Sequence, residues 1–260
     1  MKKATLITHQ GWADHFSSNG LVNYYSSLYD ELVLFASTPQ IAEMLKAIYS
    51  ESKSIKVVVP RYMSNDIVDN RGVTCVKCHT EGSRQSCPRG SGSCEYIDYT
   101  DYSDFENIKI GAFKGYPQWE RYLRESKKSF AHCFYSYESL PTDLRIRNFR
   151  VSNVAQLDPP PDSYAVVHDD PTRGISIRES IKENHIQLNQ LSKIMIDTIM
   201  ILENSKEIRL IDSSYSVFVY LLSFHNKKIA SIPKHLHASV RSSRDVSIYS
   251  EPTPEMWSVL

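Results

Sequence analysis

The stretch ELVLFASTPQIAEMLKAIYSESKSIKVVVP, residues 31–60, decides the fold because it has the pattern of a strand, a helix and a second strand. The apolar runs Glu31–Ser37 and Ile55–Pro60 are typical of buried strands. Thr38 and Pro39 between them favour an N-cap and a first helical residue. The apolar residues of this helix share one face: Ile41, Met44, Leu45 and Ile48. Continuous apolar strands separated by a helix predict a parallel sheet covered by helices.

The same alternation extends toward both ends of this half of the chain. Ala4–His9 is predicted as a strand and Gly20–Tyr29 as a helix, with a loop between them. After the polar segment 61–102, a strand is expected at Asn107–Phe113 and a helix at Pro117–Ser126.

Three consecutive prolines, Pro159–Pro161, predict a stiff linker, because they continue neither a helix nor a strand ladder. Beyond them the α/β alternation resumes. Strands are expected at Tyr164–Asp169, Glu207–Asp212 and Lys227–Ile232, with helices at Gln187–Asn204 and Ser213–Asn226. We therefore predict two α/β halves: residues 1–158, which carry a Cys-rich insertion at 61–102, and residues 163–260.

The charge balance and the first residues of the sequence indicate which classes of partner are not expected. The 260 residues contain 30 Lys plus Arg and 30 Asp plus Glu, so the formal net charge is zero and nucleic acid is not expected as a partner. The first residues, MKKATLITHQ, contain too short an apolar run for a secretory signal or a membrane span. These features predict a cytoplasmic chain with no membrane span.

Four cysteines lie close together in CVKCHTEGSRQSCPRGSGSC, residues 75–94. Paired thiolates in a polar insertion without its own core favour a structural zinc site. The predicted ligands are Cys75, Cys78, Cys87 and Cys94, and His79 is an alternative to one thiolate. Reduced cysteines or one local disulfide are the other interpretations.

Polar loops follow three of the predicted strands. They are THQGWADHFSSNG (residues 8–20), HDDPTRG (168–174) and DSSYS (212–216). Ligands of open parallel sheets bind outside the carboxyl ends of the strands, where these loops lie. The three loops are therefore the candidate functional segments.

The two later loops contain groups suited to phosphate. Arg173 is a permanently charged planar donor, and His168 at the strand end adds a further contact. The predicted helix start at Ser213 and Ser214 offers free backbone N–H groups and the positive end of the helix dipole. The alternatives are simple N-capping by either serine, and pairing of Arg173 with the neighbouring aspartates across a solvated turn.

The first loop contains candidate general bases. Asp14 and His15 lie beside Trp12, and either could take a proton from a hydroxyl group. The alternative is that each only caps the chain or forms a structural hydrogen bond.

Four segments together resemble a known class of enzyme. GWADHFSSNGLVNYY, CHTEGSRQSCPR with CEYIDY, VVHDDPTRGISI and IRLIDSSYSVFVYLL resemble glycosyltransferase-like proteins of large DNA viruses. The last two also look like the donor half of GT-B glycosyltransferases of the fucosyltransferase-like group. This resemblance implies a compact fold with two Rossmann-like halves facing a cleft.

The resemblance also implies an activity. Such an enzyme transfers a sugar from a nucleotide-sugar donor to a hydroxyl of a glycan or glycoprotein acceptor, needs no metal for catalysis, and for a viral protein would act in the host cytoplasm. Asp14 or His15 would deprotonate the acceptor if the reaction inverts the anomeric centre. The implied donor-binding residues are His168, Arg173, Ser213, Ser214 and Tyr215. A nucleotide-binding protein without transferase activity, or an interaction module stabilised by zinc, remain alternatives.

Overall fold

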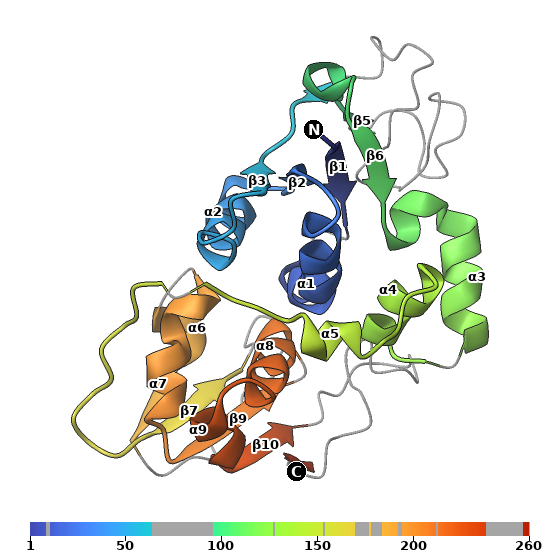
Figure 1. The fold of residues 1–260 in the computed structure, drawn as a ribbon. Helices are drawn as coiled ribbons and strands as arrows, with labels where there is room; N and C mark the ends of the chain where they lie inside the picture. Colours follow the sequence, from blue (N-terminus) through green and yellow to red (C-terminus); the bar gives the residue numbers. More distant parts are fainter. Residues whose placement is uncertain are drawn as a thin grey trace.

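A computed structural model of the protein describes residues 1–8, 11–63, 96–126, 128–152, 154–169, 177, 184–191, 194–211, 213–237 and 257–259. Within them the chain is an α/β fold with two parallel sheets (Figure 1). The first sheet has the strand order β3-β2-β1-β6, and the second has the order β11-β10-β9-β7-β8. Parallel pairing in both sheets confirms the predicted α/β class. The arrangement of two halves that face a cleft stays a prediction.

The strand–helix–strand unit of residues 31–60 forms as predicted in the first sheet. Thr38 caps α2, because its side chain accepts a hydrogen bond from the Ile41 N–H at 3.2 Å. The four apolar residues predicted for one face of this helix are all buried. The elements of the first sheet are β1 (Lys3–Ile7), α1 (Trp12–Ser26), β2 (Glu31–Phe35), α2 (Pro39–Ile48), β3 (Ile55–Val58) and β6 (Glu106–Lys109).

Two short strands, β4 (Tyr62–Met63) and β5 (Tyr96–Ile97), pair antiparallel at the ends of segment 64–95, which lies outside the described residues. Short 3-10 helices at Thr100–Tyr102 and Gly111–Lys114 flank β6. The predicted helix at 117–126 is confirmed as α3 (Tyr116–Ser126). Two further helices, α4 (Phe130–Tyr137) and α5 (Leu144–Arg147), were not predicted from the sequence.

The second sheet confirms strands at two of the three predicted places. Its strands are β7 (Ala165–His168), β8 (His185–Gln187), β9 (Glu207–Ile211), β10 (Lys234–His237) and β11 (Trp257–Val259). Its helices are α6 (Leu188–Leu191), α7 (Ile199–Glu203), α8 (Ser214–Ser223) and α9 (Lys227–Ser231). Pro159–Pro161 lies between the elements of the two sheets, and the division into two domains at this linker stays a prediction.

One hydrophobic core connects the two sheets. Side chains alternate along each strand, so Leu32 and Leu34 of β2 face this core while Val33 and Phe35 face a smaller cluster. Helices α1 and α8 lie between the sheets (Figure 1) and pack against each other. The rings of Phe16 and Phe218 meet there with centroids 4.7 Å apart. The starts of these two helices are therefore held together by buried contacts.

The predicted loop at residues 8–20 is wrong, because helix α1 begins at Trp12. Gly11 is extended, and the Asp14 carboxylate accepts its backbone N–H at 3.0 Å, which caps the helix. Ser17, Ser18 and Asn19 are buried in this helix although they are polar. Because polar residues occupy these buried positions, this part of the helix lacks the apolar spacing by which a helix is predicted from sequence.

The single helix predicted at Gln187–Asn204 is also wrong. Gln187 belongs to β8, and α6 is separated from α7 by residues 192–198, of which Met195–Thr198 form a 3-10 helix. The Gln156 side chain binds the Ile196 carbonyl and the Met200 N–H, at 3.0 and 3.2 Å. These contacts use backbone groups that a continuous helix would pair internally.

The strand predicted at Lys227–Ile232 is instead helix α9. The Asn226 side chain accepts hydrogen bonds from the N–H groups of Lys228 and Ile229, at 3.1 and 3.2 Å, which caps a helix at this point. Ile229 is fully buried, and the strand β10 begins after Pro233. An N-cap signal in Asn226 was therefore overlooked in favour of the apolar run.

Replacing Gly20 with alanine is expected to lower the free energy of unfolding by about 1–3 kcal/mol, as for other overpacked sites. A methyl group at this position would overlap the Leu144 carbonyl oxygen, and it would approach the Tyr135 hydroxyl to 2.8 Å and the Arg145 Cα to 3.1 Å. Backbone atoms of α5 leave it little room, although alanine favours a helix. Urea unfolding measures the change. Equal stability of the variant and the wild type would contradict this close approach of α1 to α5.

Candidate functional site

Three of the predicted donor-side residues, His168, Ser213 and Tyr215, are brought together at the carboxyl end of β7. His168 Nδ1 lies 3.1 Å from Ser213 Oγ, and the His168 ring lies on that of Tyr215 with centroids 4.6 Å apart. His168 and Ser213 are 8% and 5% exposed. This contact joins the end of β7 to the start of α8, and a donor site at this edge of the second sheet stays a prediction.

The start of α8 is partly capped by its own residues. The Ser213 N–H donates to Ser216 Oγ at 3.0 Å. One of the backbone N–H groups at the helix start is therefore hydrogen-bonded, in agreement with the capping alternative. Ser214, the first helical residue, is half-buried. Tyr215 is buried, and its hydroxyl donates to the Leu188 carbonyl at 3.3 Å. Capping and a role for Ser214 toward a ligand are compatible.

Asp169 does not belong to a solvated turn. It is 1% exposed, and its carboxylate accepts a hydrogen bond from the side-chain amide of Gln187. The other amide atom of Gln187, Oε1, is buried without a hydrogen-bond partner among the residues that the structure describes. Pairing across a solvated turn therefore does not explain Asp169. Arg173 and Asp170 lie outside the described residues.

Asp14 and His15 lie in the first turn of α1, at the carboxyl end of β1. Burial raises the pKa of Asp14 from 3.8 to about 7, although its hydrogen bond from Gly11 lowers it. Burial lowers the pKa of His15 from 6.5 to about 4. Within the described part of the chain, Asp14 Oδ1 and both ring nitrogens of His15 have no hydrogen-bond partner.

These unpartnered atoms are the strongest chemical signal in the first half of the chain. Buried polar groups in folded proteins are almost always hydrogen-bonded, so an unpartnered carboxylate oxygen and an unpartnered imidazole on consecutive residues need an explanation. A carboxyl group with a pKa near 7 also has the property of a general base. The structure therefore retains Asp14 and His15 as candidates for acid–base chemistry.

The two groups of predicted residues belong to neighbouring helix starts. Asp14 and His15 precede Phe16, whose ring contacts Phe218 of α8, and Ser213 caps that same helix. The residues on these two helix starts and the adjoining strand ends are called the strand-end residues here: Asp14, His15, His168, Asp169, Gln187, Ser213, Ser214 and Tyr215.

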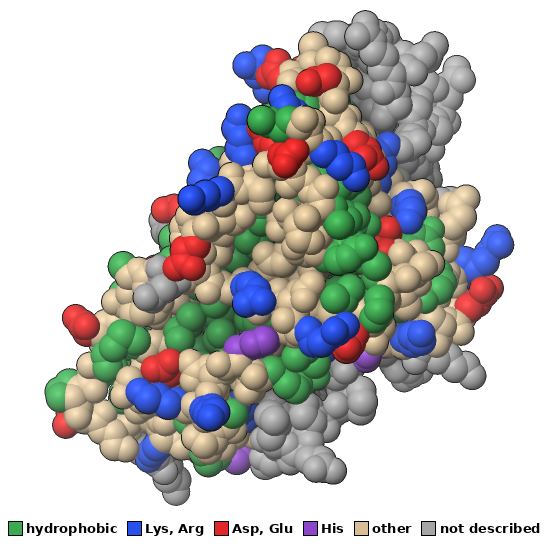
Figure 2. Space-filling model, viewed as in Figure 1, with side chains coloured by type: hydrophobic (Ala, Val, Ile, Leu, Met, Phe, Trp, Pro, Cys, Tyr) green, Lys and Arg blue, Asp and Glu red, His purple; other side chains and the backbone are tan. Residues whose placement is uncertain are grey.

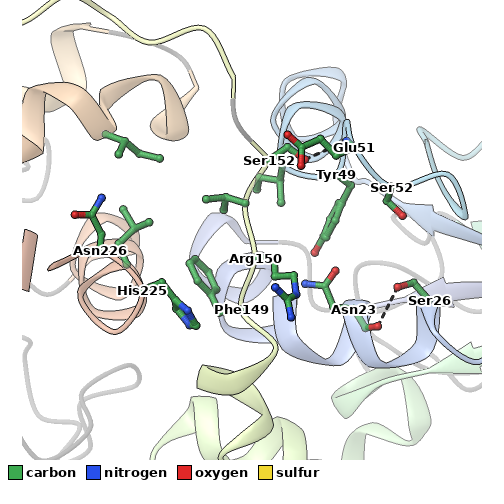
Figure 3. Close-up of a pocket in the computed structure, with 14 residues that line it drawn as sticks. Asn23, Ser26, Tyr49, Glu51, Ser52, Phe149, Arg150, Ser152, His225 and Asn226 are labelled. Carbon is green, nitrogen blue, oxygen red and sulfur yellow. Dashed lines mark hydrogen bonds between the residues drawn. The ribbon is translucent and has the colours of Figure 1, made fainter.

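A pocket of about 630 Å³ lies at the opposite ends of α1, α2 and α8 (Figure 3). This pocket was not predicted from the sequence. A signal was present in Asn19 and Asn23, two amides one helical turn apart on the buried side of α1. The lining residues are Asn23, Ser26, Ile48, Tyr49, Glu51, Ser52, Phe149, Arg150, Val151, Ser152, Ile199, Leu222, His225 and Asn226.

The predicted zinc ligands Cys75, Cys78, Cys87 and Cys94 lie outside the described residues, and so the zinc site stays a prediction. Among the residues that are described, no group of three or more His, Cys, Asp or Glu side chains is arranged to hold a metal ion. Acidic and basic side chains are interspersed on the face shown in Figure 2. No helix in the described ranges is both long enough and apolar enough to cross a membrane.

Comparison of the chain with protein-family models, with curated proteins and with solved structures finds no significant match in any of the three.

Proposed function

We propose that the protein is a glycosyltransferase that binds a nucleotide sugar at the start of α8 and moves the sugar to an acceptor hydroxyl at the start of α1. The observation that carries the proposal is the buried pair Asp14 and His15, whose carboxylate Oδ1 and ring nitrogens lack partners in the described part of the chain. In this proposal the two sheets are the halves of a compact GT-B-like enzyme. The reaction runs without a catalytic metal.

The donor side of the proposal rests on α8. Its N-terminal backbone N–H groups and dipole favour an anion, and Ser214 adds a hydroxyl that has no hydrogen bond to another described residue. A diphosphate held there would leave with its developing charge stabilised by fixed donors in place of a metal ion. Arg173 would add a charged donor.

The acceptor side rests on Asp14. With a pKa of about 7, its carboxylate is ionised in a large part of the molecules at neutral pH and still basic enough to take a proton from a hydroxyl group. His15, whose pKa is about 4, is neutral at that pH and supplies an uncharged imidazole that can orient the acceptor. The acceptor oxygen would then attack the anomeric carbon as the bond to the diphosphate breaks.

Nucleotide sugars with UDP, GDP or dTDP as carrier are expected to raise the melting temperature of the protein. A ligand at 100 times its dissociation constant stabilises the folded state by about 2.7 kcal/mol, which corresponds to roughly 5–10 °C for a chain of this size. Thermal unfolding with each donor measures the shift. No shift with any of the three carriers would refute donor binding, and the nucleotide-free sugars serve as controls.

The Ser214→Asp variant locates the donor. A carboxylate at the first turn of α8 interacts favourably with the helix dipole, so the variant should stay folded. The same carboxylate repels a diphosphate, so the donor should no longer raise the melting temperature. Gln40→Asp is the matched control, because it adds the same charge to the exposed first turn of α2. If the donor no longer raises the melting temperature of Arg150→Ala but still raises that of Ser214→Asp, the donor binds in the pocket of Figure 3 instead.

A further inference from the structure

We propose that the pocket at the ends of α1, α2 and α8 is a second binding site, and that it takes a small phosphorylated sugar. Its volume of about 630 Å³ falls within the range of small-molecule sites. Its residues come from elements of both sheets and from the segment 149–152 between them. This site is separate from the strand-end residues and does not depend on the proposed transferase activity.

The phosphate would bind at Arg150. This side chain is exposed in the pocket, and its guanidinium has no ion pair or hydrogen bond among the described residues. In the view of Figure 3, Arg150 lies between His225 and Asn23. A guanidinium presents several N–H donors in a plane, which matches a phosphate better than a single donor does.

His225 is oriented to bind a hydroxyl group of the ligand. Its Nε2 lies 2.7 Å from the Ile146 carbonyl oxygen, and because a carbonyl only accepts, Nε2 carries the proton of this bond. The other ring nitrogen, Nδ1, has no hydrogen bond to any described residue. In the neutral ring Nδ1 accepts, so it suits a hydroxyl group of the ligand rather than the phosphate. The ring also lies 6.0 Å from that of Phe149, which forms part of the same wall.

The wall that carries Arg150 is fixed before any ligand arrives. Asn19 is fully buried, and its side chain binds both backbone groups of Arg150: Oδ1 accepts the N–H at 2.8 Å, and Nδ2 donates to the carbonyl at 2.9 Å. Asn23 Nδ2 donates to the Asn148 carbonyl at 2.9 Å. Such preorganisation lowers the entropy that binding would otherwise cost.

The remaining polar groups suit hydroxyls. The α2 side of the pocket presents Glu51 and Ser52, and α1 presents Ser26 (Figure 3). A carboxylate together with hydroxyls accepts and donates hydrogen bonds to a polyol but repels a second anion. Leu222, Ile199 and Phe149 supply an apolar surface for the carbon face of a sugar ring. The pocket therefore fits a ligand that has a phosphate at one end and several hydroxyl groups at the other.

Titration calorimetry of the full chain with glucose 6-phosphate, inorganic phosphate and glucose tests the site. We expect glucose 6-phosphate to bind more tightly than inorganic phosphate, and both more tightly than glucose. The Arg150→Ala substitution should lower the affinity for glucose 6-phosphate by about 10- to 100-fold, the usual effect of losing a charge-assisted hydrogen bond. Arg147→Ala is the matched control, since this exposed arginine pairs with Asp143 and does not line the pocket.

The proposal would be overturned by equal affinity of Arg150→Ala and wild type, by equal weakening in both arginine variants, or by no binding of either phosphorylated compound up to about 10 mM. Glucose binding as tightly as its phosphate would also reject the anion subsite. Arg150→Gln, which keeps the side-chain stem, provides a second variant if the alanine form unfolds. The melting temperature without ligand reports on folding in each case.

Discussion

Replacing Asp14 with asparagine is expected to lower the rate of sugar transfer by about 100- to 10,000-fold, the usual contribution of a general base. The affinity for the nucleotide sugar should stay within about twofold of wild type, because the base acts on the acceptor. Asparagine keeps an oxygen that can accept the Gly11 N–H, so the cap of α1 is retained. A transfer assay and donor calorimetry on the same preparation separate the two effects.

The pH profile gives this prediction a second measurement. Because burial places the pKa of Asp14 at about 7, kcat/KM should rise with pH below that value and level off above it. The Asp14→Asn variant should lose this rise. Asp101→Asn, which changes an exposed aspartate outside the strand-end residues, is the control and should keep both the rate and the profile.

Other results would reassign the base. Undiminished transfer in Asp14→Asn together with a large loss in His15→Gln would assign proton removal to His15. Undiminished transfer in both variants would exclude the start of α1 from the chemistry. Loss of donor affinity together with rate in Asp14→Asn would show that the carboxylate acts on the donor, which contradicts the proposed arrangement.

The sequence predicted those parts of the fold in which local signals and tertiary packing agree. Residues 31–60 formed as expected because the Thr38 cap, the Pro39 start and the apolar face of α2 all favour the same helix. The prediction was wrong where the apolar run of a segment and the cap before it favour different structures. Lys227–Ser231 is apolar enough for a strand, but the Asn226 side chain caps it as a helix.

The strand-end residues were partly predictable, because the ends of parallel strands are defined by the strands themselves. In the structure His168 and Ser213, which follow two neighbouring strands, lie 3.1 Å apart, while their role at a donor site stays a prediction. The pocket was not predictable in the same way. Arg150 lies in a segment without regular structure, and its position depends on the side chain of Asn19, a contact across 131 positions of the chain. Sequence periodicity contains no information about such a pair.

The unfolding free energies of Asp14→Asn and His15→Gln are expected to change in opposite directions between about pH 4.5 and pH 6.5. The two residues are adjacent and both are buried, but burial shifts their pKa values in opposite senses because it disfavours the charged form of each. This prediction depends on burial alone and does not require transferase activity.

The direction follows from which state holds the proton. Folded Asp14, with a pKa of about 7, keeps a proton that the unfolded chain releases near 3.8, so its contribution to stability falls as the pH rises from about 4 to about 7. Folded His15, with a pKa of about 4, releases a proton that the unfolded chain keeps up to 6.5, so stability falls as the pH drops through that interval. In the wild type the two contributions oppose each other.

Each substitution therefore exposes the contribution of the other residue. Asp14→Asn should become more stable by about 2–3 kcal/mol from pH 4.5 to pH 6.5, and His15→Gln less stable by a similar amount, since each pH unit in this interval changes the free energy by about 1.4 kcal/mol. Urea unfolding at both pH values measures the difference. The remaining titratable groups are common to both variants. The double variant lacks Asp14 and His15, so its pH dependence measures the contribution of those remaining groups. Parallel changes in the two single variants would mean that water reaches both side chains.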